Sequence, residues 1–304
     1  MNTATQSTVD TSVARARGVD AVIAGQPAMD GAGVKLTRII GSPELNRADP
    51  FLLFDVFESD QPGDYIAGFP PHPHRGFETV TYMLAGRMEH QDSVGNRGVI
   101  ETGGVQWMTA ASGIIHSEMP KQQDGLLRGV QLWVNLPARL KLSAPGYREF
   151  AANAIPAEQR DGARLRVVAG QTVTGVKGPV QGVVTDPLFL DVELEPNARF
   201  AEALPAGHRA ILYVVTGDIS IPDQAVAGQT GVTARQLAVL GPGDKLVVRA
   251  GPDSARFLLV AARPLNEPIA RGGPFVMNTR EEIKQAFADY NAGRLLKAPA
   301  AQEE

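Results

Sequence analysis

The sequence predicts an all-β protein built from two β-sandwiches or barrels. Short segments rich in Val, Ile, Leu, Phe and Thr recur along the 304 residues, separated by turns that draw on 32 glycines and 22 prolines. Helical periodicity is convincing only near the C-terminus, and a similar pattern occurs twice, about half a chain apart. Regularly spaced short strands without intervening helices favour a sandwich or barrel over alternating β-α units.

The expected strands are about five to nine residues long and end at turn residues. They comprise 34–40, 50–58, 78–84, 129–136, 164–168, 188–194, 209–215, 236–240 and 255–261. After them, Thr279 can cap a short helix with two glutamates in its first turn, and Gly293 marks its end.

The internal repeat defines the expected domains. Residues 81–86 (Thr-Tyr-Met-Leu-Ala-Gly) resemble residues 212–217 (Leu-Tyr-Val-Val-Thr-Gly). This similarity predicts two related β-domains, although an aromatic strand followed by glycine is also a common local pattern. We expect a flexible N-terminal tail at 1–16, an N-terminal barrel at 17–141, a linker at 142–162, and a C-terminal barrel plus helix at 163–304.

Composition excludes several functional classes. The net charge of −4 argues against a nucleic-acid-binding surface. The absence of cysteine excludes disulfides, thiolate catalysis and cysteine-ligated metals. No apolar run approaches the roughly 20 residues of a membrane helix, and the first 16 residues lack the apolar core of a secretory signal. We therefore expect a cytoplasmic protein.

Four residues predict a metal site. In a strand, residues two apart point to the same face, so His72 and His74 can project together, as can His116 and Glu118. If the two strands are neighbours, three imidazoles and one carboxylate meet, a set suited to Fe(II), Mn(II), Cu(II), Ni(II) or Zn(II). An isolated His-x-His is more often a surface feature. The second pair, His116 and Glu118, is what favours the interpretation as a metal site.

The same alternation, continued beyond His74, places Glu78, Val80 and Tyr82 on the face of His74, as inward-facing residues of a barrel. The prolines on either side of His72 cannot donate ladder hydrogen bonds, so this segment is expected to begin a strand or lie at a sheet edge. His90 has the same parity and is expected as a pocket or loop residue.

Four segments, residues 68–82, 106–120, 131–137 and 273–279, resemble the signature of the pirin family in the cupin superfamily. The resemblance spans about residues 19–294. It implies two cupin barrels, with a metal bound by His72, His74, His116 and Glu118 in the first and none in the second. In other cupins the position of Glu78 is often a ligand, whereas here the pirin pattern implies that Glu78 supports the ligands.

The resemblance also implies non-haem Fe(II) and quercetin 2,3-dioxygenase activity, in which dioxygen cleaves a flavonol or similar enol substrate. Glu118 would accept the substrate hydroxyl proton. Apolar walls could come from Phe57, Val80, Tyr82, Met108 and Trp133, and Arg75, Glu78 and Gln131 could orient the ligands.

Two other functions remain open. The family is also described as iron-dependent, redox-sensing transcription co-regulators, which here would act through a protein partner because no DNA-binding motif is present. The third possibility is a cupin that isomerises or binds another small molecule.

Overall fold

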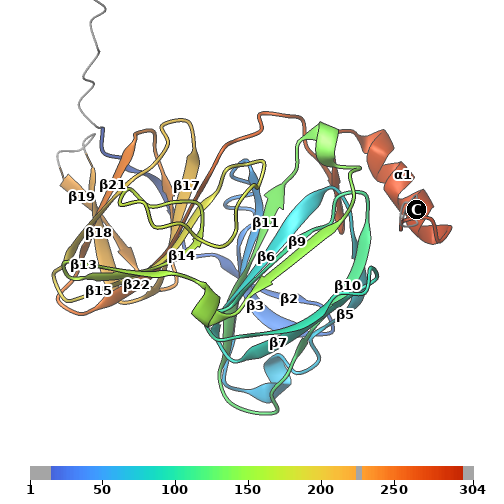
Figure 1. The fold of residues 1–304 in the computed structure, drawn as a ribbon, viewed down its shortest axis with the longest axis horizontal. Helices are drawn as coiled ribbons and strands as arrows, with labels where there is room; N and C mark the ends of the chain where they lie inside the picture. The colour runs from blue at the N-terminus through green and yellow to red at the C-terminus, as the bar shows by residue number, and fades with distance from the viewer. Residues whose placement is uncertain (1–14, 224–227, 297–304) are drawn as a thin grey trace, which may run out of the picture.

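The computed structural model describes residues 15–223 and 228–296, which form two β-sandwiches side by side (Figure 1). The all-β prediction, with one short C-terminal helix, is confirmed for this part of the chain. The expected tail at 1–16 lies almost wholly outside the described residues. No helix among the described residues has the length and apolarity needed to span a bilayer.

The N-terminal sandwich contains the strands β2 (Gln26–Asp30), β3 (Val34–Ile40), β4 (Phe51–Ser59), β5 (Phe69–His74), β6 (Phe77–Ala85), β7 (Arg87–Asp92), β8 (Arg97–Glu101), β9 (Val105–Thr109), β10 (Ile114–Pro120), β11 (Leu127–Asn135) and β12 (Gly146–Phe150). They pair in a seven-stranded sheet, β12-β9-β6-β11-β4-β3-β2, and a four-stranded sheet, β5-β10-β7-β8, within the described residues.

The C-terminal sandwich contains β1 (Val19–Ile23), β13 (Ala157–Arg160), β14 (Ala163–Ala169), β15 (Leu188–Leu194), β16 (Arg199–Ala203), β17 (Arg209–Thr216), β18 (Asp218–Asp223), β19 (Gly228–Thr233), β20 (Leu237–Leu240), β21 (Lys245–Ala250) and β22 (Ala255–Ala262). Its sheets have the orders β1-β20-β17-β22-β15-β14-β13 and β16-β21-β18-β19. Strand by strand these orders repeat those of the first sandwich, so the predicted duplication is confirmed.

The remaining elements follow the second sandwich. A hairpin of β23 (Ala270–Gly272) and β24 (Phe275–Met277) leads into α1 (Arg280–Asn291), and short 3₁₀ turns occur at Pro62–Asp64, Ala138–Leu140 and Ala152–Ala154. The α1 cap is as predicted: Thr279 Oγ1 accepts from the Glu282 N–H, and the Glu282 carboxylate accepts from the Thr279 N–H. All nine expected strand segments coincide with strands to within two residues at each end.

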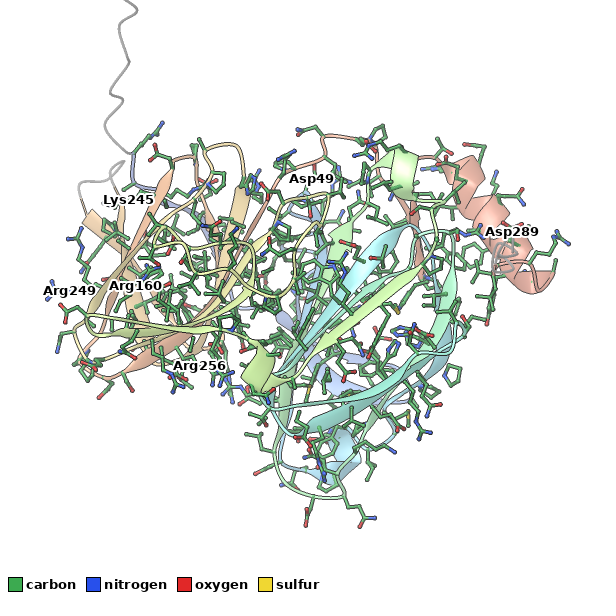
Figure 2. All side chains as sticks on the ribbon, viewed as in Figure 1. Asp49, Arg160, Lys245, Arg249, Arg256 and Asp289 are labelled. Carbon is green, nitrogen blue, oxygen red and sulfur yellow. The ribbon has the colours of Figure 1, made fainter. Side chains whose placement is uncertain are left out.

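The chain crosses the expected domain limits in three places. Strand β1 pairs with β20 and so lies in the C-terminal sheet, although it precedes the first repeat. The expected linker at 142–162 holds β12, which extends the N-terminal sheet, and β13, which extends the C-terminal one. Helix α1 lies against the N-terminal sandwich, where the labelled Asp289 is far from Lys245 and Arg249 (Figure 2). Sequence order does not reveal these exchanges because each depends on which sheet edge is free.

The two seven-stranded sheets pack face to face, and their shared core positions the site. Phe54 of one sandwich lies 5.4 Å from Tyr213 of the other, measured between ring centroids, and Tyr82 lies 5.4 Å from Phe189. Strand β6 is almost wholly buried because one of its faces lines this interface and the other lines the N-terminal interior. The interior of the C-terminal sandwich is packed with apolar side chains, including Leu190, Leu212, Val248 and Phe257; that it holds no metal stays a prediction.

Candidate metal centre

Strands β5 and β10 bring three histidines together. The strands are antiparallel neighbours, with His116 directly opposite His72 and Ile114 opposite His74. Strand β5 lies at the edge of its sheet, as its prolines predict. One ring nitrogen from each of the three histidines lies within 4.8 Å of those of the other two. The group could therefore hold a metal ion.

Hydrogen bonds to the backbone fix the proton positions on the two β5 histidines. His72 Nδ1 lies 2.8 Å from the Pro70 carbonyl oxygen, and His74 Nδ1 lies 3.3 Å from that of Pro274. A carbonyl oxygen can only accept, so both Nδ1 atoms carry the proton. In the neutral ring, Nε2 then bears a free lone pair on each histidine.

A chain of polar groups fixes His116 in the same way. The Asp92 carboxylate accepts from the Val94 N–H, the Asn96 N–H and the Asn96 side chain, so it is an acceptor for His90 Nε2 at 3.2 Å as well. His90 therefore has its proton on Nε2, and its Nδ1 accepts from His116 Nδ1 at 3.4 Å. His116 Nε2 is left as a lone pair, and this buried atom has no hydrogen-bond partner.

Three lone pairs thus point into one small volume. His72 Nε2 and His74 Nε2 are 3.0 Å apart, and with the proton of each neutral ring on Nδ1 a cation between the two lone pairs would stabilise this arrangement. Burial, with a contribution from the nearby His72, lowers the pKa of His74 to about 3, and burial and the neighbouring imidazoles hold the pKa of His116 well below its ordinary value. Neutral imidazole is the form that binds metal, so the residues fit a divalent transition metal.

Glu118 lies in the same region and is held rigidly. The side chain is 2% exposed, and its carboxylate accepts from Thr81 Oγ1 at 2.8 Å and from Gln131 Nε2 at 2.7 Å. Gln131 is oriented in turn by the Trp133 indole N–H, 3.1 Å from its oxygen. The carboxylate oxygens are not among the mutually close ligand atoms of the three histidines, so the role of Glu118 as a metal ligand stays a prediction.

A cavity of about 580 Å³ opens beside the histidines. His72, His74 and Gln131 are among the polar residues that line it. Its walls are mostly apolar, and the lining includes Leu36, Leu53, Phe57, Phe69, Pro70, Pro71, Trp133 and Pro274 together with the charged residues Asp30, Arg38, Asp55 and Arg271. The volume is in the range of sites for small organic molecules.

The comparisons with known proteins agree with this architecture. The family model described as Pirin matches residues 33–134, and that described as Pirin C-terminal cupin domain matches residues 189–296. The chain belongs to the pirin family. A pirin-like protein of Caulobacter vibrioides is 52% identical over 274 residues, which cover 90% of this chain and 97% of that protein. Pirin of Homo sapiens is 44% identical over 86% of this chain and 88% of its own length.

Similarity to solved structures extends over the same length. The crystal structure of a quercetin 2,3-dioxygenase from Acinetobacter baumannii matches with a TM-score of 0.83 and 32% sequence identity. The match covers 92% of this chain and 99% of that one. Both sandwiches, and not only the one with the three histidines, are therefore shared with this structure.

One prediction about side-chain direction is wrong, because alternate residues of β6 do not face the histidines. Glu78, Val80 and Tyr82 point away from the histidines: the Tyr82 hydroxyl donates to Asp191 of the other sandwich, and Val80 packs in the shared core. Glu78 accepts from Thr109 Oγ1 at 2.7 Å, and burial raises the pKa of its carboxyl. The alternation fails because the chain turns at Gly76, where φ is +90°, between two strands of different sheets.

Two other expected pocket residues act elsewhere. Arg75 forms an ion pair with Asp289 of α1 at 2.7 Å and donates to the Ser112 carbonyl, so it anchors the helix instead of orienting a ligand. Met108 packs with Ala110 and Ile114 and does not line the cavity.

Phe57, Gln131 and Trp133 do line the cavity, as expected. Sequence analysis did not assign Asp92 or Arg271 to the site and identified Pro274 only within the segment 273–279. Their relation to the histidines depends on strand pairing and on a hairpin some 200 residues away.

Proposed function

We propose that the chain is a metal-dependent oxygenase of the quercetin 2,3-dioxygenase type, which uses Fe(II) to cleave a flavonol or a similar enol substrate with dioxygen. The observation that carries the proposal is the convergence of His72, His74 and His116, with one ring nitrogen of each within 4.8 Å of the others, beside a cavity that His72 and His74 line. The 32% identity to a quercetin 2,3-dioxygenase of known structure supports the reaction class.

His72, His74 and His116 would hold the metal, with Glu118 as the proposed fourth ligand. When bound, the metal would supply Lewis acidity that favours the deprotonated form of an enol hydroxyl. Metal sites with few protein ligands leave positions open to substrate, as a catalytic centre requires.

The protein's own groups would position the substrate and move its proton. Phe57 and Trp133 offer flat apolar surfaces for an aromatic ring. The Glu118 carboxylate is the proposed acceptor of the hydroxyl proton. Its two hydrogen bonds, from Thr81 and Gln131, fix its orientation before substrate arrives.

Oxygen consumption by the iron-loaded protein tests the proposal. The full chain is loaded anaerobically with Fe(II), freed of excess metal and mixed with quercetin in aerated buffer, while oxygen uptake and carbon monoxide are measured. We expect rapid uptake with carbon monoxide released. Tight iron binding without turnover on any flavonol would refute the oxygenase and favour the redox-sensing regulator.

Two histidine variants make the result specific to the site. His116→Ala should lose stoichiometric iron and turnover while keeping its circular dichroism spectrum, because one imidazole contributes little to the packed sheets. His208→Gln, in the other sandwich, should retain both. Full iron content in His116→Ala would contradict the ligand assignment.

A further inference from the structure

Arg271 lines the cavity with a guanidinium that no carboxylate contacts directly, although the charges of Asp55 and Asp30 lie near enough to attract it. Its guanidinium carbon lies 4.8 Å from the centre of the Trp133 ring, and Nη1 donates to the Leu52 carbonyl at 3.3 Å. Arg271 lines the same cavity as His72 and His74. It takes part in none of the ion pairs formed by the described residues, so most of its N–H donors are free.

Arg38, the other arginine of the cavity, is paired directly with two carboxylates. Its Nε and Nη2 bind the two Asp55 oxygens at 2.9 and 2.7 Å, and Nη2 also binds Asp30 at 2.8 Å. This bidentate pairing satisfies both Asp55 oxygens. The two Asp55 oxygens are therefore engaged by Arg38, and Asp55 and Asp30 act on Arg271 only through their charges, without a direct hydrogen bond to it.

The two arginines are neighbours. A Cβ atom at Gly41 would lie 3.5 Å from Arg271 Nη1 and 3.6 Å from Arg38 Cδ. Burial and the adjacent Arg38 charge lower the pKa of Arg271, although a guanidinium stays protonated at neutral pH. A charge held in this way gains from an anionic ligand more than a fully solvated one does.

We propose that Arg271 binds a carboxylate of the substrate, so that the cavity takes a small planar enol acid. The enol end would face the histidines and the carboxylate would face Arg271. A guanidinium binds a carboxylate through two parallel hydrogen bonds, and its stacking on Trp133 restricts the orientation of that fork. The enol half rests on the proposed function, whereas the carboxylate half rests on Arg271 itself.

A matched pair of ligands tests the carboxylate part of the proposal separately from the enol part. Kojic acid and comenic acid are 5-hydroxy-4-pyranones with the same chelating enol and ketone oxygens, and they differ at one ring carbon, which carries hydroxymethyl or carboxylate. Their dissociation constants are measured by calorimetry on the full chain loaded with Zn(II), which has no redox chemistry. Comparing variants cancels the intrinsic difference between the two ligands in affinity for zinc.

Wild-type protein should prefer comenate, and Arg271→Gln should reduce that preference about tenfold or more, as expected for loss of a charge-assisted hydrogen-bonded pair. The kojic acid constant should stay within about twofold. Arg271→Lys should recover part of the preference, and Arg249→Gln, at the far end of the other sandwich (Figure 2), should leave it unchanged.

An unchanged preference in Arg271→Gln would overturn the inference, and so would failure of comenate to bind wild-type protein. Arg271-dependent binding of comenate together with no oxygen uptake by the iron form would sustain the carboxylate site and refute only the oxygenase.

Discussion

Replacing His90 by leucine should weaken divalent metal binding by about 10- to 100-fold. His90 Nδ1 is the acceptor for His116 Nδ1 at 3.4 Å, and His116 is only 1% exposed, so solvent cannot substitute. A buried donor without an acceptor costs about 1–3 kcal/mol. The imidazole can avoid that cost by moving its proton to Nε2, the atom required for the metal. Whether His116 keeps an unpaired Nδ1–H or moves the proton to Nε2, the tautomer that binds metal is disfavoured by about 1–3 kcal/mol.

Competition for Zn(II) against a chromogenic chelator at pH 7.5 measures this effect. Tyr147→Phe is the matched control, because the Tyr147 ring stacks on His90 with centroids 4.6 Å apart while its hydroxyl donates to Glu149. It should bind zinc within about twofold of wild type. His90→Gln keeps an acceptor and should recover part of the affinity. Wild-type zinc affinity in a folded His90→Leu protein would refute the assigned proton positions.

Two further predictions concern stability, measured by urea unfolding. The pKa of His74 is about 3 in the fold, so between about pH 6.5 and 3 the unfolded chain binds a proton that the folded chain does not. The free energy of unfolding of the metal-free protein should therefore fall by up to about 1.4 kcal/mol per pH unit on acidification. His74→Asn should show a shallower fall, and a slope equal to that of wild type would contradict the lowered pKa. Gly76→Ala would place Cβ 1.9 Å from the Val276 carbonyl oxygen and should cost more than about 2 kcal/mol. Gly95→Ala, at a similar φ of +94° but in open space, should cost clearly less, and equal losses would argue against the steric cause.

The strands that the sequence predicted are those with continuous apolar, β-branched character, such as β15 and β17. Strand β7 escaped prediction, and β5 was expected only as the start of a strand or a sheet edge. Three of the six residues of β5 are prolines. Strand β7 has the sequence Arg-Met-Glu-His-Gln-Asp, in which the buried His90 pairs with Asp92 and the buried Glu89 pairs with Arg97 and Lys121. Strand prediction from sequence relies on the pattern of apolar residues, so it does not detect a strand that polar pairs stabilise.

The three histidines could be predicted because side chains two residues apart in a strand point to the same face, whatever the rest of the fold. The same rule failed across Gly76, since a positive φ there redirects the chain into another sheet. For β6 the sequence offers no guide to which face is inward, because Thr81 toward Glu118 and Tyr82 toward Asp191 are both buried. Register within a strand can be inferred from sequence, whereas the choice of sheet depends on tertiary packing.

The C-terminal half contributes to the metal centre through the hairpin of β23 and β24. The Pro274 carbonyl holds the proton of His74 Nδ1, and the Val276 N–H donates to the Arg75 carbonyl at 3.0 Å. The buried Lys141 ammonium ties both sides together, with Nζ 2.7 Å from the Gly76 carbonyl oxygen and 3.1 Å from that of Val276.

Without this hairpin His74 would lose the acceptor that fixes its proton, and the cavity would lose Arg271 and Pro274 from its wall. A neutral histidine without such an acceptor can place its proton on either nitrogen, and only one of the two forms directs a lone pair at the other ligands. The N-terminal sandwich holds the three histidines that could bind a metal, yet it depends on the second half of the chain for the acceptor that orients His74 as a ligand.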